Sequence, residues 1–325
     1  MKLSHIYGYL KKDMKDIDER LADSIEAEHT VLRDASMHLL QAGGKRIRPV
    51  FVLLAASFGD EKTYEEDIKA VAVALELIHM ATLVHDDVVD DASLRRGEAT
   101  IKSLYGNRVA MYTGDYMLAR ALEVITTVQN PRIHQILSKT LVKVVEGEIS
   151  QIKEKFNVNQ SLKDYLHRIK RKTALLIATS CELGAVAAGA STKDAKRLYR
   201  YGYHVGMSFQ IIDDLLDFTA STEQLGKPAG SDLMQGNITL PILFAMEDDT
   251  FKGILEETFR TYDVIDETAI APLLLKLHQS DAVERSYQLS NRYLEKSLND
   301  IQMLHDHSSK KTLQMIAAFI GKRRS

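Results

Sequence analysis

Two short runs of aspartate are the residues of this sequence with the clearest capacity for chemistry. The first run is His85-Asp86-Asp87-Val88-Val89-Asp90-Asp91, and the second is Asp213-Asp214-Leu215-Leu216-Asp217. In both runs a third aspartate follows the first by four residues, so on a helix these two carboxylates share one face about 6 Å apart along the axis. Runs of carboxylates are usually solvated, but both of these follow apolar sequence, which is harder to reconcile with two surface faces.

If the two runs face each other, they form a site made of oxygen ligands alone. The chain contains one cysteine, Cys181, which excludes a multi-cysteine zinc site, and hard carboxylates select Mg²⁺ over Zn²⁺. Mg²⁺ is held by few carboxylates and completes its octahedral shell with water and substrate phosphates. The two runs therefore predict a magnesium site that binds a phosphorylated substrate.

Basic segments supply the opposite charge. Gly43-Gly44-Lys45-Arg46-Ile47-Arg48-Pro49 places two glycines before closely spaced cations, and such a loop can bring backbone and guanidinium groups close to a phosphate. Each basic segment alone is more often a solvated surface run. Together, two acidic runs that are each followed by a basic, glycine-containing loop indicate a metal-bridged diphosphate, whose departure is assisted by positioning and charge. The other basic segments are Ser93-Leu94-Arg95-Arg96-Gly97, Arg168 to Lys172 before Thr173, and Gly226-Lys227-Pro228.

The rest of the chain must position these residues, and its pattern is helical. Only five prolines interrupt 325 residues. Between them apolar residues recur with helical period, as in Ile17, Leu21 and Ile25, while alternating runs and Asn-Gly or Asp-Gly hairpin signals are scarce or absent. We predict an all-α fold in which one domain spans residues 1–325. The most apolar stretches, Ala70 to Val84 and Leu175 to Ala190, are expected at the centre of a helical bundle.

Charge and the terminal sequence limit the possible partners. Lys and Arg number 42 and Asp and Glu number 45, a net charge of −3, which argues against a generic nucleic-acid binder. The N-terminal residues resemble no signal peptide, and the Ala70 to Val84 stretch contains Glu76 and His79, so it is too short and too polar to span a bilayer. We therefore expect a cytoplasmic protein without a transmembrane segment.

These motifs, in this order, resemble the trans-type prenyl diphosphate synthases. The resemblance covers roughly residues 35 to 245 and joins Gly-Gly-Lys-Arg-x-Arg-Pro, Asp-Asp-x-x-Asp, Arg-Arg-Gly and a second Asp-Asp-x-x-Asp. Ile78-His79-Met80-Ala81, Tyr112 to Tyr116 and Lys170 to Ala174 are most similar to the large catalytic subunit of bacterial two-component heptaprenyl or hexaprenyl diphosphate synthases. Those enzymes make the menaquinone side chain.

The resemblance implies a helical bundle around a cavity and a role for each motif residue. It implies Mg²⁺, two or three ions bridging the allylic diphosphate. Isopentenyl diphosphate would be condensed onto an allylic primer, farnesyl diphosphate, by ionisation, condensation and elimination. The implied metal ligands are Asp86, Asp87, Asp90, Asp213, Asp214 and Asp217. The implied allylic diphosphate contacts are Arg95, Lys172 and Lys227. The implied isopentenyl diphosphate contacts are Lys45, Arg48, His79 and Arg96. The residues implied at the reacting centre are Lys172, Thr173 and Gln210.

The resemblance also implies a long isoprenoid product and a partner subunit. Short-chain members carry a bulky aromatic one turn before the first acidic run, where this chain has Ala81 and Thr82. A small Ala81 implies a long product that ends near Ile78 or Leu77. The large subunits of this type need a small, non-homologous subunit, so we expect a heterodimer. Asn237 stands where many members have a second lysine, and the C-terminal Lys322-Arg323-Arg324 resembles a basic tail that can close over a diphosphate.

Other functions fit parts of the sequence. A terpene cyclase shares an ionising acidic run, but the second run and the Gly-Gly-Lys-Arg-x-Arg-Pro loop favour elongation. His85-Asp86 is also typical of His-Asp phosphohydrolases. Glu26-x-x-His29 and Glu76-x-x-His79 have the spacing of di-iron carboxylate bundles, a function that leaves both acidic runs unexplained. A regulatory subunit with a degenerate site is disfavoured because both runs are intact.

Overall fold

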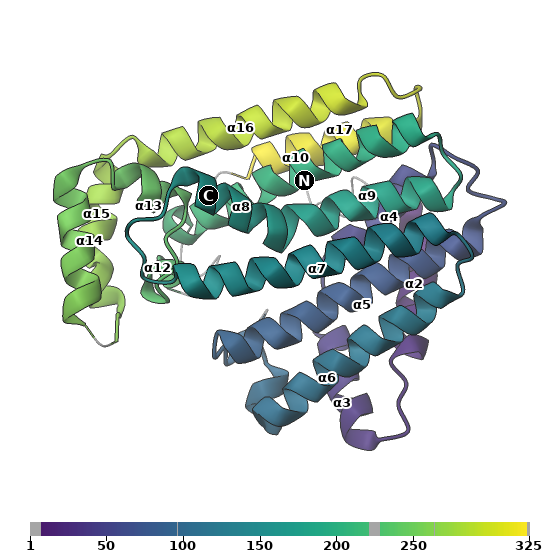
Figure 1. Ribbon diagram of the computed structural model, residues 1–325, viewed down its shortest axis with the longest axis horizontal. Helices are drawn as coiled ribbons and strands as arrows, with labels where there is room; N and C mark the ends of the chain where they lie inside the picture. Colours follow the sequence, from purple (N-terminus) through teal and green to yellow (C-terminus); the bar gives the residue numbers. More distant parts are fainter. Residues whose placement is uncertain (1–7, 96, 221–227, 263, 324–325) are drawn as a thin grey trace. The chain divides into compact units, whose positions relative to one another are not determined.

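The computed structural model describes residues 8–95, 97–220, 228–262 and 264–323 (Figure 1). Its regular elements in this part of the chain are helices and one hairpin of two short strands with two residues each, which confirms the all-α prediction. The first elements are η1 (Gly8–Leu10), α2 (Lys11–Ser24), α3 (Thr30–Gln41), α4 (Ile47–Ala56), α5 (Glu65–Val89), β1 (Leu94–Arg95), β2 (Glu98–Ala99), α6 (Ile101–Thr126) and α7 (Pro131–Glu154). The later ones are α8 (Leu162–Ile169), η2 (Lys170–Ala174), α9 (Leu175–Ala187), α10 (Thr192–Thr219), α12 (Ser231–Met234), α13 (Leu240–Ala245), α14 (Asp249–Thr261), α15 (Glu267–Gln279), α16 (Ala282–Ile301) and α17 (Ser308–Gly321).

The chain forms two compact units. Unit 1 comprises Met1–Ser138, Thr179–Tyr199 and Leu304–Leu313, and unit 2 comprises Lys139–Ala178, Arg200–Met303 and Gln314–Ser325. The boundaries between them fall within α7, α9, α10 and α17 and in the loop between α16 and α17. The first acidic run therefore belongs to unit 1 and the second to unit 2. One domain over residues 1–325 stays a prediction.

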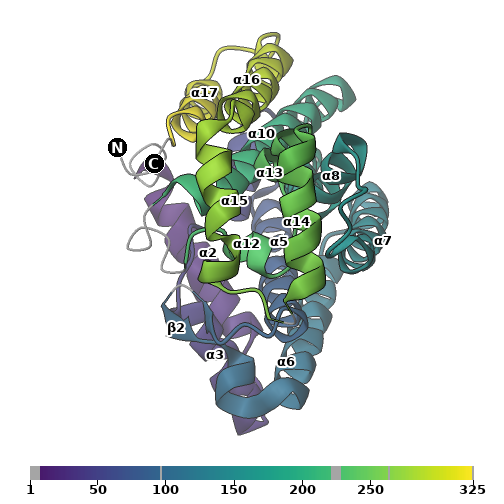
Figure 2. The same ribbon diagram turned by 90° about the vertical axis from the view of Figure 1, so that its left-hand side faces the viewer.

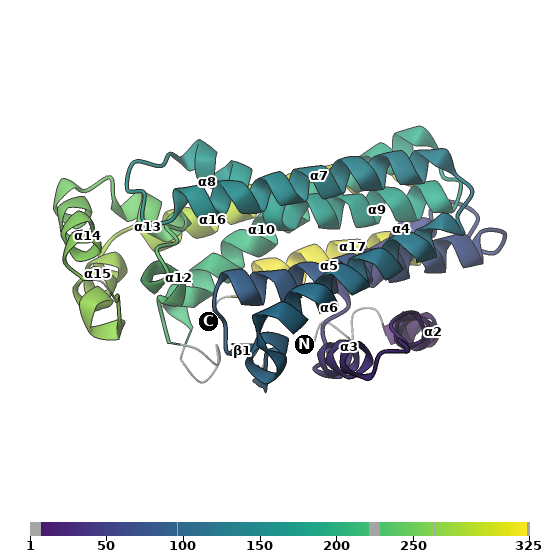
Figure 3. The ribbon, with the colours of Figure 1, turned by 60° about the horizontal axis from the view of Figure 1, so that its bottom comes forward.

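Helix α5 is the centre of unit 1. It packs against α2, α4 and α6, and Figures 1 and 3 both show it running beside α6. Its N-terminal turn carries Glu65, Glu66 and Asp67, which favour the positive end of the helix dipole. Its middle is buried on every face, as its continuous apolar sequence requires. The apolar row of α2, Ile17 and Leu21, is also completely buried.

By length and composition alone α5 would be able to cross a membrane, because the helix extends beyond the Ala70 to Val84 stretch on which the expectation was based. The helix extends over 25 residues, from Glu65 to Val89, and is therefore longer than its apolar core. However, 72% of its apolar window is buried. That burial is what a central core helix of a globular protein requires, in agreement with the predicted position of Ala70 to Val84.

Unit 2 has a separate apolar core around α13, α14, α15 and α16. Helices α14 and α15 lie side by side (Figure 2), and Asp248 and Asp266 begin them, because their side chains accept hydrogen bonds from the backbone of the first turn. Ile242, Leu255 and Ile270 are fully buried among these helices. This core supports the second half of α10, which carries the second acidic run.

Candidate active site

The first acidic run lies at the C-terminal end of α5. Asp86 and Asp87 are in its last turn, and Asp90 is the capping residue, whose backbone N–H donates to the Asp86 carbonyl at 2.8 Å. Negative charge is unfavourable here because the helix dipole is also negative at this end. Arg95 offsets part of that cost, since its Nε and Nη2 lie 2.8 and 2.7 Å from Oδ1 of the buried Asp87.

The hairpin of β1 and β2 turns the chain back so that Arg95 reaches this carboxylate. Leu94 pairs with Ala99 and Arg95 with Glu98, and Figure 3 shows β1 close to the end of α5. The side chain of Thr100 then begins α6 by accepting from the backbone of Ser103 at 3.2 Å. Arg95, a predicted diphosphate contact, therefore pairs with Asp87, a predicted metal ligand. Arg96 lies outside the described residues.

The Gly-Gly-Lys-Arg loop is tied to α5 through an arginine that the motif analysis left without a role. Arg46 adopts a left-handed conformation, with φ of 46°, before α4 begins. Its Nη1 donates to Oε1 of the buried Glu76 at 3.2 Å. Because Glu76 and His79 are three residues apart, they share a face of α5. This ion pair holds the loop beside the face that carries the half-buried His79, with Lys45 exposed and Arg48 half-buried.

Glu76 therefore has a structural role that sequence spacing concealed. Its pairing with Arg46 explains the Glu-x-x-His pattern as an anchor for the loop. Two arginines, Arg46 and Arg48, follow the glycines of this loop. If one of them compensates the buried Glu76, only the other can contact a phosphate. The presence of two arginines was therefore the available signal for this anchor.

The second acidic run lies within the C-terminal part of α10, where Asp214 is the centre of a hydrogen-bonded chain. Tyr165 Oη donates to Asp214 Oδ2 at 2.7 Å, and Gln210 Nε2 donates to Asp214 Oδ1 at 2.8 Å. Thr173 Oγ1 in turn donates to Gln210 Oε1 at 2.6 Å. Burial raises the pKa of Asp214 to about 7, and the negative charge of nearby Asp232 adds to the shift while the two donors oppose it. Three predicted site residues, Thr173, Gln210 and Asp214, are thereby joined directly.

The two other aspartates of this run have different partners. Asp213 Oδ1 accepts from Arg323 Nη1 at 2.8 Å, so the C-terminal basic segment does reach the acidic run. The buried Asp217 accepts from Ser231 Oγ at 2.9 Å, and its other oxygen accepts from the backbone N–H of Asp232 at 3.1 Å. Asp217 thus holds the start of α12, a structural role that the motif alone does not indicate.

Lys172 lies in η2, a π-helical turn between α8 and α9, and such turns often occur at functional sites. Its Nζ donates to Gln151 Oε1 at 3.0 Å and lies 3.9 Å from Glu148 Oε2, both on α7. Within unit 2, η2 also approaches α10 closely, because a Cβ on Gly206 would lie 2.6 Å from the Cα of Ala174. A glycine at position 206 is what allows Thr173 to reach Gln210.

The predicted chain-length residues line up along α5 before the first acidic run. Leu77, Ile78 and Ala81 are buried, and Thr82 is half-buried with its hydroxyl donating to the His79 carbonyl at 2.8 Å. Ala81 packs in an apolar cluster that includes Leu39 of α3 and Met117 of α6. A larger side chain at position 81 would meet this cluster.

Two further predictions concern the segment after α10. Lys227 lies outside the described residues. Asn237, which stands in place of a family lysine, lies in the loop between α12 and α13, where its backbone N–H donates to the Asp232 carbonyl at 2.8 Å.

The donor chemistry of the two acidic runs fits Mg²⁺. All six carboxylates are hard oxygen ligands, and Mg²⁺ needs only one or two of them at a time because water and phosphate complete its shell. Among the described residues no group of three His, Cys, Asp or Glu side chains forms a ready-made cage. Several of these carboxylates instead accept from Arg95, Arg323, Tyr165 or Ser231.

Comparison with known proteins agrees with this chemistry. The family model for polyprenyl synthetase matches residues 29–271. Heptaprenyl diphosphate synthase component 2 of Geobacillus stearothermophilus is 54% identical over 323 residues, which cover 99% of each chain. The crystal structure of heptaprenyl diphosphate synthase from Staphylococcus aureus matches with a TM-score of 0.92 and 41% identity over 97% of this chain and 99% of that one. Polyprenyl synthase from Caulobacter crescentus CB15, crystallised with calcium and isoprenyl diphosphate, matches with a TM-score of 0.93 and 30% identity over 100% and 98% of the two chains.

Proposed function

This chain belongs to the polyprenyl synthetase family, and we propose that it is the catalytic component of a medium- to long-chain trans-prenyl diphosphate synthase. It condenses isopentenyl diphosphate repeatedly with an allylic primer, farnesyl diphosphate, to give hexaprenyl or heptaprenyl diphosphate for menaquinone. The observation that carries the proposal is the pair of acidic runs, each with a cation supplied by another segment, in a chain whose full length matches a heptaprenyl synthase component. The family match gives no support to a terpene cyclase or a His-Asp phosphohydrolase.

The proposal gives the six aspartates to Mg²⁺ and the allylic diphosphate. The calcium and isoprenyl diphosphate of the Caulobacter crescentus structure support a divalent metal. When bound, Mg²⁺ neutralises charge on the leaving diphosphate. Arg95 and Arg323, which pair with Asp87 and Asp213 in the described chain, are then available to the diphosphate itself.

The remaining residues position the two substrates. Lys172 and Arg95 hold the allylic diphosphate together with Lys227, and Lys45, Arg48, His79 and Arg96 hold isopentenyl diphosphate. The allylic C–O bond breaks with its electron pair leaving on diphosphate, and the isopentenyl double bond attacks the carbocation. The oxygens of Thr173 and Gln210 stabilise positive charge beside the reacting carbons. A proton is then lost to the released diphosphate, so that no side-chain nucleophile is needed.

The proposal also includes a second component and a location. The relative's name, component 2, supports a partner protein, and we expect a small, non-homologous subunit without which this chain is weakly active. We place the enzyme in the cytoplasm, from where it passes its product to the membrane.

The test of this function is a direct assay of product length. The purified chain is incubated with farnesyl diphosphate, labelled isopentenyl diphosphate and Mg²⁺, with and without the companion component of the Geobacillus stearothermophilus enzyme. Mass spectrometry is expected to show hexaprenyl or heptaprenyl diphosphate in the mixture with both proteins. The absence of elongation from both mixtures, with both proteins folded, would contradict the proposal, and high turnover by the chain alone would contradict the partner requirement.

The product length is tested by Ala81→Phe. Because Ala81 lies one turn before Asp86, a phenyl ring there blocks the apolar path along α5, and we expect product shortened to about the farnesyl or geranylgeranyl level. The ring also overpacks the Leu39 and Met117 cluster, which costs about 1–3 kcal/mol of stability. Ala81→Ser serves as the control that keeps the path open. An unchanged product distribution from a folded, active Ala81→Phe enzyme would refute the assignment.

A further inference from the structure

Tyr165 of α8 belongs to no motif, yet it ends a chain of hydrogen bonds that leads to the predicted reacting centre. Its side chain is fully buried, and its hydroxyl donates to Asp214 Oδ2 at 2.7 Å. The other oxygen of this carboxylate accepts from Gln210 Nε2, and Gln210 Oε1 in turn accepts from Thr173 Oγ1. All four residues belong to unit 2. A buried side chain thus reaches Thr173 through two others.

The hydrogen bonds of this chain run in one direction, because the ionised carboxylate of Asp214 can only accept them. Gln210 must therefore turn its amide N–H group toward Asp214, which leaves its amide oxygen for Thr173. Thr173 gives its only hydroxyl proton to that oxygen, so its lone pairs point elsewhere. In the proposed mechanism these lone pairs face the positive charge of the allylic cation. In a chain of the opposite direction the hydroxyl proton would face that charge and destabilise it.

Arg168 holds Tyr165 at its end of the chain. The guanidinium carbon of Arg168 lies 5.5 Å from the centre of the Tyr165 ring, in the arrangement of a cation–π contact. Arg168 is itself buried, and its Nη1 donates to Glu154 Oε2 and to Gln160 Oε1, each at 2.8 Å. Its Nη2 donates to the Ile238 carbonyl. These contacts use the guanidinium within the protein, so Arg168 supports the tyrosine.

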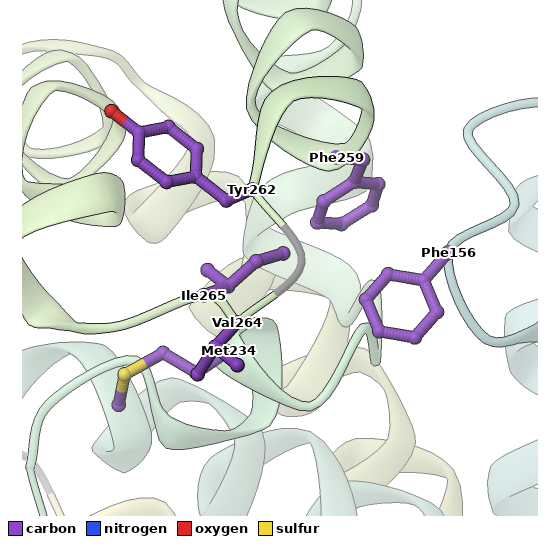
Figure 4. A pocket seen from close by; sticks show the side chains of 6 residues that line it. All are labelled: Phe156, Met234, Phe259, Tyr262, Val264 and Ile265. Carbon is purple, nitrogen blue, oxygen red and sulfur yellow. The ribbon is translucent and has the colours of Figure 1, made fainter.

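The two loops that contact Arg168 are joined to each other beside the apolar pocket of Figure 4. In the loop between α7 and α8, the backbone N–H of Phe156 donates to the Gly236 carbonyl of the loop between α12 and α13, at 2.8 Å. The Phe156 ring meets the ring of Phe259 edge-on with centroids 5.2 Å apart, and both rings line the pocket. The support of Tyr165 is therefore fixed by side-chain packing and by a backbone hydrogen bond.

We propose that Tyr165 is a positioning residue for the condensation, which fixes the direction of the Thr173 lone pairs through Asp214 and Gln210. This role rests on the proposed function, because it requires a positive charge beside Thr173. An ionised carboxylate has about four lone-pair sites, so Asp214 can accept both hydrogen bonds and still serve the metal. Tyr165 touches no substrate and acts only through the two side chains between it and Thr173.

Two unreactive substrate analogues test this role without turnover. One is farnesyl diphosphate saturated at its allylic double bond. The other is the same molecule with a protonated nitrogen in place of the carbon that would carry the positive charge. Both bind through the same diphosphate and Mg²⁺, so the ratio of their dissociation constants isolates the interaction with the charge. Calorimetry on the chain with the companion component of the Geobacillus stearothermophilus enzyme measures this ratio, and we expect the unaltered chain to bind the charged analogue more tightly.

Tyr165→Phe cuts the chain and keeps the ring that Arg168 contacts. We expect this variant to lose roughly tenfold of the preference for the charged analogue, because Thr173 is no longer held in one orientation. Tyr203→Phe is the matched control, since Tyr203 is a half-buried tyrosine of α10 whose ring lies under Lys170. It should keep the ratio of the unaltered chain.

Asp214→Asn gives a second measurement that does not depend on the folding of Tyr165→Phe. The amide of this variant can donate to Gln210 as well as accept, so the direction of the chain is no longer fixed. Any change in metal binding affects both analogues alike. We expect a loss of preference at least as large as that of Tyr165→Phe.

A double-variant cycle decides whether Tyr165 acts through Thr173. With Thr173→Val the lone pairs are absent, so the further substitution Tyr165→Phe should leave the ratio unchanged. Independent effects of the two substitutions would overturn the role of Tyr165, as would an unaltered ratio in Tyr165→Phe. Equal binding of both analogues by an unaltered chain that elongates farnesyl diphosphate overturns this role alone. An unaltered chain that binds neither analogue refutes the proposed function and this role together.

Discussion

The two acidic clusters have the same motif, but their carboxylates are held in different ways. At the end of α5, Asp87 is balanced by one charged side chain, Arg95, which a short hairpin returns to it. In α10, Asp214 accepts hydrogen bonds from uncharged Tyr165 and Gln210, and Asp217 holds the first turn of α12. The buried Asp87 of the first cluster is thus compensated by charge. In the second cluster only Asp213 pairs with a cation, Arg323, whereas Asp214 and Asp217 are built into the packing of unit 2.

This difference separates function from stability. A carboxylate that is balanced by a cationic side chain can change partners when metal and diphosphate arrive. A carboxylate that accepts from buried donors also contributes to the fold, because its removal leaves those donors without an acceptor. We therefore expect substitution of the half-buried Asp86 to affect activity alone, and substitution of the buried Asp214 or Asp217 to affect activity and stability together.

The largest effect is expected for Asp86→Asn in the first cluster. Loss of one group that stabilises charge at the leaving diphosphate lowers kcat about 10³-fold, with the melting temperature unchanged. Steady-state elongation and thermal unfolding are measured together. Asp91→Asn is the matched control, because Asp91 belongs to the same acidic run but pairs with Lys102 outside the motif. If Asp91→Asn is as inactive as Asp86→Asn, the motif positions have no special role.

Asp217→Ala is expected to show the structural side of the second cluster. It leaves Ser231 and the backbone N–H of Asp232 without their acceptor, which lowers the free energy of unfolding by about 2 kcal/mol. Urea unfolding measures this change, with Asp86→Asn as the control that keeps full stability. Equal stabilities of the two variants would contradict the expected difference between the two clusters.

The metal-free protein should also lose stability as pH rises, because of Asp214. Burial raises the pKa of its carboxyl from 3.8 to about 7, so the folded state binds a proton between these values that the unfolded state has released. That contribution is complete below pH 3.8 and disappears as pH rises through 7. Asp214→Asn keeps an acceptor for Tyr165 and removes the titration. We expect chemical unfolding between pH 4 and 8 to show a flatter profile for this variant, and an unchanged slope would contradict the assignment to Asp214.

The smallest effect is expected at Gln151. Its amide oxygen accepts from Lys172, whereas the cation of the first cluster, Arg95, is held by a carboxylate. Gln151→Ala frees Lys172 from α7 and is expected to lower kcat several-fold while KM for the allylic substrate changes little. Gln151→Glu is the comparison variant, since it keeps an acceptor for the lysine and should restore most of the rate. If both variants have the same rate, Lys172 is not positioned through Gln151.

Local sequence was enough to predict the fold class, the central helix and the family. Helical period and scarce proline are enough to predict an all-α chain, because the spacing of apolar residues along a helix is set by its own geometry. The stretch Ala70 to Val84, predicted to be central, is buried over most of its length. The motifs, taken in order, were enough to identify the family that the comparisons confirm.

The partners of individual side chains could not be predicted in this way. Tyr165 and Ser231 belong to no motif, yet they donate to Asp214 and Asp217. Glu76 suggested a di-iron ligand and Arg46 had no assigned role, yet the two form one ion pair. The length of this central helix was underestimated, because α5 continues beyond Ala70 to Val84 at both ends.

The sequence by itself therefore determined the fold class, the family and the two carboxylate runs, because these depend on residue types and short spacings. Only the tertiary structure decided that Arg95 compensates Asp87, that Asp217 supports α12, and that Lys172 is held by α7. These contacts join segments that are distant in the sequence or that meet through a turn. Whether such segments meet depends on the packing of whole helices, which no local pattern specifies.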